Sequence, residues 1–200
     1  ELADAIAGFH RAAERRLTAG GAAAVAALIE NNAQSFAGCA PGALDVGAIG
    51  RLLTGWRAQL DDQRTLVEER QARGRVRHCH GDLHLGNIVL HEGRPTLFDA
   101  IEFNDAFADI DVLYDLAFLL MDLAHRGHGP QANVVFNRYL DASGGEEPGD
   151  GLALLPLFIS LRAGIRAHVE AVAADSQADP EPVVGASPTL PVHAGEIQTR

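Results

Sequence analysis

The side chains that could carry out chemistry crowd into residues 77–99. Three histidines (His78, His80 and His84), one carboxylate (Asp82) and one carboxamide (Asn87) fall within ten residues. A carboxylate held in a glycine-flanked turn after a strand can orient and deprotonate a substrate hydroxyl, which makes Asp82 a candidate general base. Asn87 offers a neutral oxygen to a hard cation.

A second carboxylate, Asp99, lies twelve residues after Asn87. Apolar runs at residues 88–90 and 95–98 predict two short strands, and residues 91–94 predict the turn of a hairpin between them. A hairpin returns the chain to its starting point, so Asn87 and Asp99 should meet at its open end. Their oxygens, with waters and phosphate oxygens, suit Mg²⁺. A base and two metal ligands form the catalytic half of a phosphotransferase.

Kinase catalytic loops carry a His, any residue, an Asp, four residues and an Asn, with a metal-binding Asp after the next hairpin. Residues 80–87 and Asp99 follow that spacing, with Gly81 where kinases have Arg. The sequence resembles the aminoglycoside phosphotransferase and choline kinase family, relatives of protein kinases. The likeness rests on His-Gly-Asp-Leu-His-x-Gly-Asn at 80–87, Phe-Asp at 98–99 and Asp-Val-Leu-Tyr-Asp-Leu-Ala at 111–117.

This resemblance implies an ATP-dependent phosphotransferase that transfers the γ-phosphate to the hydroxyl of a small molecule. It implies Asp82 as the catalytic base and Asn87 and Asp99 as Mg²⁺ ligands. It also implies structural roles for His80 and for Asp115, which would tie a buried helix to the loop. We interpret His84 as a residue that orients the loop rather than one that takes part in the chemistry.

The sequence departs from the family pattern at several points. Val112 stands where the family has Pro, and either Glu102 or Asp105 could replace an acidic residue that usually follows the metal-binding Asp. The chain contains no lysine, since all 16 basic residues are Arg. Kinases of this type anchor the phosphates with a Lys in an N-terminal lobe. Residues 2–73, which read as helices, do not provide such a lobe.

We therefore expect residues 1–175 to form the helical C-terminal lobe of a protein-kinase-like fold whose N-terminal lobe is missing. Residues 176–200, rich in proline, predict a disordered tail or linker that could lead to a downstream P-loop domain. On this interpretation the full-length protein is the enzyme and the 200-residue chain alone is inactive. A truncated, inactive remnant or binding module is the main alternative. A metal-dependent hydrolase is a second alternative, because His78, His80, Asp82 and His84 form a dense set of possible zinc ligands.

The remaining elements must hold this loop in place. Helical periodicity predicts an α+β fold that is mainly helical, with the small β-hairpin at the active site. Asp45 and Asp109 are expected to cap the helices that follow them, and Trp56 is expected in the core. The predicted helices cover residues 2–17, 22–36, 46–73, 109–124, 130–140 and 152–174, with a short strand at 75–79.

Charge and composition narrow the partners. The net charge of −11 and the pI of about 5.1 argue against a nucleic-acid binder, which should be basic, and favour a cationic substrate. With 47% hydrophobic residues, the chain can form a core, but it has no apolar run of 18 residues and is not expected to bind a membrane. Two cysteines and no visible signal peptide suggest a reducing, cytoplasmic compartment.

Overall fold

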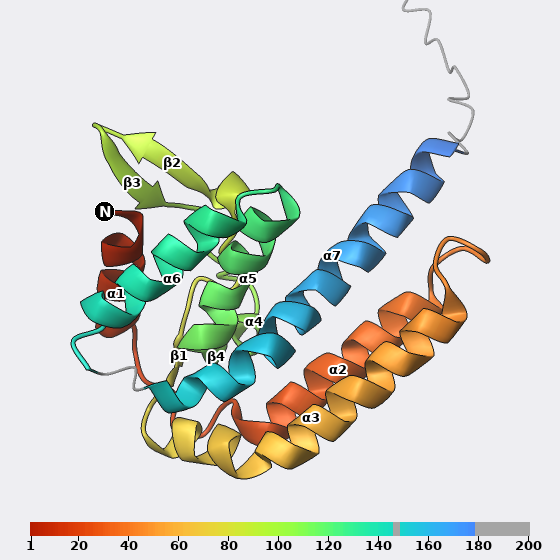
Figure 1. Ribbon diagram of the computed structural model, residues 1–200, viewed down its shortest axis with the longest axis horizontal. Coiled ribbons are helices and arrows are strands. Elements are labelled where there is room, and N and C mark those ends of the chain that lie inside the picture. Colours follow the sequence, from red (N-terminus) through yellow and green to blue (C-terminus); the bar gives the residue numbers. More distant parts are fainter. Residues whose placement is uncertain (146–148, 179–200) are drawn as a thin grey trace, which may run out of the picture.

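The computed structural model describes residues 1–145 and 149–178 and shows a mainly helical chain with two small antiparallel sheets (Figure 1). The helices are α1 (Leu2–Ala12), α2 (Gly21–Ala37), α3 (Val46–Ala72), α4 (Asp105–Ala108), α5 (Val112–His125), α6 (Gly129–Ala142) and α7 (Leu155–Ala178). The strands are β1 (Val76–His78), β2 (Ile88–His91), β3 (Arg94–Leu97) and β4 (Asp109–Asp111), and short 3₁₀ helices lie at η1 (Leu85–Asn87) and η2 (Gly149–Leu154). The predicted helical character and hairpin are confirmed, whereas residues 179–200 of the predicted tail lie outside the described residues.

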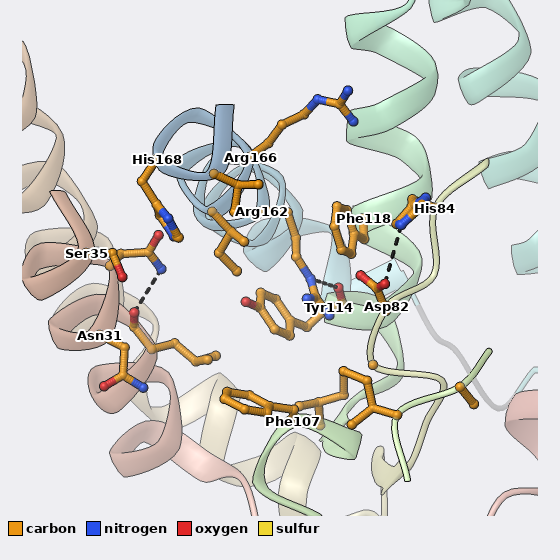
Figure 2. Close-up of a pocket in the computed structure, with 18 of the residues that line it drawn as sticks. Asn31, Ser35, Asp82, His84, Phe107, Tyr114, Phe118, Arg162, Arg166 and His168 are labelled. Atoms are coloured by element: carbon orange, nitrogen blue, oxygen red, sulfur yellow. Dashed lines mark hydrogen bonds and ion pairs between the residues drawn. The ribbon is translucent and has the colours of Figure 1, made fainter. Parts of the chain in front are cut away.

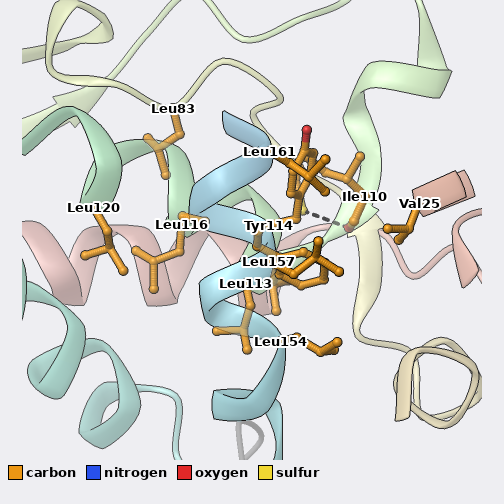
Figure 3. Packing of buried hydrophobic residues seen from close by; sticks show 14 of the residues in the cluster. Val25, Leu83, Ile110, Leu113, Tyr114, Leu116, Leu120, Leu154, Leu157 and Leu161 are labelled. Carbon is orange, nitrogen blue, oxygen red and sulfur yellow. Dashed lines mark hydrogen bonds between the residues drawn. The ribbon is translucent and has the colours of Figure 1, made fainter. Parts of the chain in front are cut away.

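Helix α5 is the centre of the fold. It is almost entirely apolar, packs against α6 on one side and α7 on the other, and has twelve buried residues among its fourteen. Leu113, Leu116 and Leu120 of α5 belong to the same hydrophobic cluster as Leu157 and Leu161 of α7 (Figure 3). Burial of this face, rather than helix propensity, holds the two helices together.

Helices α2 and α3 lie side by side and pack against α7 (Figure 1). Asp45 caps α3, where its side chain accepts hydrogen bonds from the N–H groups of Gly47 and Ala48. Trp56 is buried, as predicted, and its indole N–H donates to Ser160 Oγ at 2.8 Å. A Cβ atom at Gly164 would lie 2.5 Å from Trp56 Cη2, so only glycine lets α7 approach α3 this closely.

The first helix is shorter than predicted. Helical periodicity continues to Leu17, but α1 ends at Ala12. The following backbone pairs with β1 instead: Arg16 N–H donates to Val76 O at 2.9 Å, and His78 N–H donates to Glu14 O at 2.8 Å. Because these interstrand bonds satisfy the backbone groups that a longer helix would use, the sheet overrides the local helical pattern.

The prediction that Asp109 caps a helix starting there is wrong. Residues 109–111 form β4, which pairs with β1, and Asp111 is the cap of α5, accepting from Leu113 N–H at 2.8 Å. Asp109 accepts instead from His78 Nδ1 at 2.8 Å and from Arg16 Nε at 3.0 Å. The strand pairing therefore moves the helix start by three residues.

One segment, Gly151–Asp175, is long and apolar enough to cross a membrane by length and composition alone. Core helices that never meet a membrane pass the same test, and 33% of this apolar stretch is buried in the fold. Here α7 packs against α2 and α5.

The pairing of Asp111 with Arg70 should be a major contribution to stability. The Arg70 side chain is 2% exposed, and its Nε and Nη2 donate to Asp111 at 2.8 and 2.9 Å. Asp111→Ala removes this partner and the cap of α5, so we expect the free energy of unfolding to fall by about 3–5 kcal/mol, measured by urea denaturation. The control Asp61→Ala removes an exposed ion pair with Arg64 and should cost under about 1 kcal/mol. Equal losses would contradict this assignment.

Candidate functional site: the loop at residues 80–87 and its cleft

The loop leaves β1, runs through η1 and enters β2. Gly81 allows its first turn for two reasons. Its φ of +80° lies in the left-handed region, and a Cβ atom there would stand 2.9 Å from Phe107 O. A residue with a side chain would have to push the loop away from the segment that follows Asp99.

Asp115 of α5 lies beneath the start of the loop and holds it. Its carboxylate is fully buried and accepts from His80 N–H at 3.2 Å, from Gly81 N–H at 2.9 Å and from His10 Nε2 at 3.1 Å. Burial by itself raises the pKa of Asp115. The hydrogen bond from His10 and the nearby positive charges, including Arg162, outweigh burial and leave the pKa below its usual range. The Asp115 carboxylate therefore holds the backbone of the loop at His80 and Gly81.

His10 is part of this anchor, although its sequence neighbourhood offers no signal for it. The residue is 3% exposed on α1, and its Nδ1 hydrogen-bonds the hydroxyl of Tyr139 on α6 at 2.9 Å. His10 and Asp115 are 105 residues apart and come together because α1 and α5 both pack against α6.

A second buried carboxylate, Asp122, holds the middle of the loop. It lies on α5, is fully buried, and accepts from Leu85 N–H at 3.0 Å, from Arg126 Nε at 3.0 Å and from Arg166 Nη1 at 2.6 Å. Burial by itself raises the pKa of Asp122. The hydrogen bond from Leu85 N–H and the charges of Arg126 and Arg166 outweigh burial, so the pKa lies below its usual range. The role of Asp122 was not predicted from the sequence. An acidic side chain within the most apolar helix could have indicated it, because a buried carboxylate needs hydrogen-bond donors.

The two loop histidines adopt fixed and different positions. His80 is 1% exposed and donates from Nε2 to Phe98 O at 2.9 Å, which ties the loop to the end of the hairpin. His84 accepts from Gly86 N–H at Nδ1, packs edge-on against Phe118, and places Nε2 3.4 Å from Asp82 Oδ2. A Cβ atom at Gly86 would lie 2.7 Å from His84 Cε1, so glycine lets the ring fold back over η1.

Asp82 and Asn87 are in direct contact. Asn87 Nδ2 donates to both the backbone O and the Oδ2 of Asp82, each at 3.0 Å. The Asp82 side chain is 40% exposed, whereas Asn87 is nearly buried. Within the described residues, neither Asp82 Oδ1 nor Asn87 Oδ1 has a hydrogen-bond partner. The contact fixes both side chains and leaves one oxygen of each available.

The hairpin brings Asp99 back to this pair. Ile88 pairs with Leu97 in the β2–β3 register, and Phe98 N–H donates to Asn87 O at 3.1 Å. Asp99 follows directly, is exposed, and has a φ of +61°, which is unusual for a residue other than glycine. Such backbone strain is typical of functional positions.

These residues open onto a cleft of about 1330 Å³. Gly81, Asp82, His84 and the segment 99–103 form one wall, α2 forms the opposite wall, and Tyr114 and Phe118 of α5 lie with Arg162 of α7 between them (Figure 2). This volume exceeds that of a typical small-molecule pocket, so the cleft has room for a ligand next to Asp82.

The donor set fits Mg²⁺ better than zinc. Asn87 and Asp99 present oxygens, and no partner for the Asp99 carboxylate is found within residues 1–145 and 149–178. Hard cations prefer such ligands. The alternative zinc set is not assembled, because His78 Nδ1 contacts Asp109 and His80 Nε2 contacts Phe98 O. A buried group of possible metal ligands does exist at His10, Cys79 and Asp115, where His10 and Asp115 already hydrogen-bond each other.

The depressed pKa of Asp115 predicts a specific pH dependence of stability. A carboxylate with a lowered folded-state pKa stabilises the fold above the unfolded-state value of about 3.9, and this contribution disappears as pH falls through the folded-state pKa. At pH 7, Asp115→Asn should lower the free energy of unfolding by about 3 kcal/mol or more. The difference from the unmodified protein should shrink below about pH 4, as measured by urea denaturation across pH. The control Asp62→Asn, on the exposed face of α3, should show a small gap at every pH. A gap for Asp115→Asn that persists undiminished at low pH would contradict the assignment.

Comparison with known proteins assigns the family. The chain is 30% identical over 200 residues to uncharacterized proteins of Mycobacterium tuberculosis and Mycobacterium bovis, which covers 98% of the chain and 39% of each relative. The chain thus spans about two fifths of the length of these relatives. No solved structure matches significantly. The sequence profile of the phosphotransferase enzyme family matches residues 1–152, which include the whole loop, the hairpin and α5. The chain therefore belongs to the phosphotransferase enzyme family.

Proposed function

We propose that this chain is the C-terminal lobe of a kinase-like enzyme that transfers the γ-phosphate of ATP to the hydroxyl of a small molecule. The observation that carries the proposal is the double hydrogen bond from Asn87 to Asp82, with Asp99 returned beside it by the hairpin. Asp82 and Asp99 line the cleft, and Asn87 contacts Asp82 directly, which supports a base and two oxygen ligands acting together. Family membership supports the reaction class.

Asp82 is the proposed base. Its Oδ2 is held by Asn87 and lies near His84, which leaves Oδ1 to accept the proton of a substrate hydroxyl in the cleft. A general base must be within hydrogen-bond reach of the proton it takes, so a fixed carboxylate is favoured over a mobile one. His80, His84 and Asp115 act on the reaction only through the position of the loop.

Asn87 and Asp99 would hold Mg²⁺ through their side-chain oxygens. When bound, the ion would neutralise charge on the phosphates. The protein's contribution is to orient the two ligands. Asn87 is fixed by its donation to Asp82, and Asp99 is fixed by the backbone bond between Phe98 and Asn87.

The parts that bind the nucleotide are proposed to lie outside residues 1–200. The chain has no lysine, and the phosphate-anchoring residue of kinases is a Lys. The much greater length of the mycobacterial relatives is consistent with further lobes or domains, including a downstream P-loop domain. The absence of lysine also favours a second candidate, a binding module that has kept the loop without transferring phosphate.

Substitution of the proposed base and metal ligand tests the reaction. In the full-length protein, Asp82→Asn and Asp99→Asn should each lower Mg²⁺-dependent phosphoryl transfer by about 10²–10⁴-fold, because each removes a charge the reaction needs. Transfer is measured by ³¹P NMR of products. The matched control, His91→Ala in the exposed hairpin turn, should retain activity. Full activity in Asp82→Asn would refute the base assignment, and tightly bound zinc in the purified protein would favour a hydrolase.

The proposal that the nucleotide-binding parts lie outside this chain leads to a separate prediction. The 200-residue chain alone should show no saturable binding of Mg·ATP by calorimetry, because two ligands on one rim give too few phosphate contacts. The full-length protein should bind it. Saturable, Asp99-dependent binding by the chain alone would show that the nucleotide site is contained in these residues.

A further inference from the structure

The interior of the cleft contains buried polar atoms without partners. Arg162 is 5% exposed and Tyr114 is 3% exposed, yet Arg162 Nη2 and the Tyr114 hydroxyl have no hydrogen-bond partner in the described part of the chain. Both residues line the cleft, and the Tyr114 hydroxyl points into it towards α2 (Figure 2). A buried donor left unpaired costs about 1–3 kcal/mol, so a ligand that supplies partners to these atoms would recover part of that cost.

Arg162 is rigidly held, so it cannot turn away to find another partner. Its Nε donates to Tyr114 O at 3.2 Å, and its guanidinium lies 3.9 Å from the centre of the Tyr114 ring and 4.7 Å from that of Phe118. Its Nη2 lies 4.0 Å from Asp115 Oδ1, the oxygen that accepts from Gly81 N–H. The positive charge is therefore fixed next to the residue that precedes Asp82.

Among the described residues that line the cleft, Arg162 is the arginine that has no carboxylate within hydrogen-bond distance. Arg166 already pairs with Asp122 at 2.6 Å and with Glu170 at 2.7 Å. Burial lowers the pKa of His168, which favours the neutral ring at pH 7. Asp115 faces Arg162, but it also accepts from His10 and two backbone N–H groups.

The wall opposite Asp82 is polar and uncharged. Helix α2 contributes Asn31, Asn32, Gln34 and Ser35 to the lining, and Asn32 Oδ1 is a further buried atom without a partner in the part of the chain that the structure describes. Amides and hydroxyls of this kind pair with the hydroxyls of a sugar or polyol. Burial raises the pKa of Tyr114, so its hydroxyl stays protonated and can donate.

We propose that the acceptor is a polyhydroxylated carboxylate, such as a sugar acid, whose carboxylate binds Arg162 and the Tyr114 hydroxyl while its hydroxyls face α2 and Asp82. This inference rests on the proposed function for its reaction, but the binding it describes does not require ATP. It reverses the cationic substrate suggested by the net charge of −11. Net charge describes the whole surface, whereas this inference rests on one fixed guanidinium, that of Arg162. The lining of the cleft also contains the carboxylates of Asp82, Asp99, Glu102 and Glu170.

Three probes with the same ring test the carboxylate. Glucuronate, glucose and glucosamine present a carboxylate, no charge and an amine, respectively. Titrated into the 200-residue chain and followed by NMR, glucuronate should bind at least about tenfold more tightly than glucose, because hydrogen bonds to charged groups contribute more than neutral ones. Glucosamine should bind no better than glucose.

Variants identify the residue responsible. Arg162→Met should abolish the preference for glucuronate, and Arg162→Lys should retain only part of it because an ammonium lacks the two-pronged fit to a carboxylate. Tyr114→Phe keeps the ring and should weaken glucuronate binding without affecting glucose binding. This variant tests the site independently if the Arg162 variants fail to fold. The control Arg57→Gln removes one exposed positive charge outside the cleft and should change nothing.

The outcomes separate this inference from the proposed function. Equal binding of the three probes, no binding of any, a preference for glucosamine, or a preference that survives Arg162→Met would each overturn the acceptor class. Mg²⁺-dependent transfer to a neutral or cationic sugar would uphold the phosphotransferase and overturn the inference. Arg162-dependent glucuronate binding in a full-length protein that transfers no phosphate would uphold the site and overturn the reaction.

Discussion

The arrangement of the site depends on one buried charge, the carboxylate of Asp115. A charge removed from water is tolerated only when donors surround it, and here these are the backbone N–H groups of His80 and Gly81 and the imidazole of His10. These donors come from two segments far apart in sequence. The need to satisfy one carboxylate therefore fixes the loop, α1 and α5 relative to one another.

Asp122 extends this constraint along the helix. It follows Asp115 by seven residues, so the two carboxylates lie on the same face of α5, roughly 10 Å apart. Asp115 holds the loop at its start, and Asp122 holds it at Leu85. Asp82 lies between these two attachment points. The loop is thus supported along a rigid helix, which explains how a short irregular segment can present a side chain in a defined position.

Local patterns predicted the hairpin, because a short turn between two apolar runs leaves few geometries. They did not predict the direct contact between Asp82 and Asn87. They did not predict the end of α1 or the start of α5, where pairing with β1 competes with helix formation. His10 and Arg162 were missed for a different reason. The contacts of each residue come from helices that are far apart in sequence and pack together only in the folded state. Periodicity within one helix carries no information about such contacts. Asp122 was detectable as a charge inside an apolar helix.

The distance in sequence between His10 and Asp115 also constrains the order in which the protein can fold. During synthesis the loop at 80–87 leaves the ribosome before α5, and Asp122 gains its Arg166 partner only after most of α7 has been made. Contacts of such high sequence separation form late and slowly. The nascent chain therefore carries its candidate base in an unfixed loop until α5 has emerged, because both carboxylates that hold the loop lie on that helix. Asp122 gains its last partner only when α7 packs.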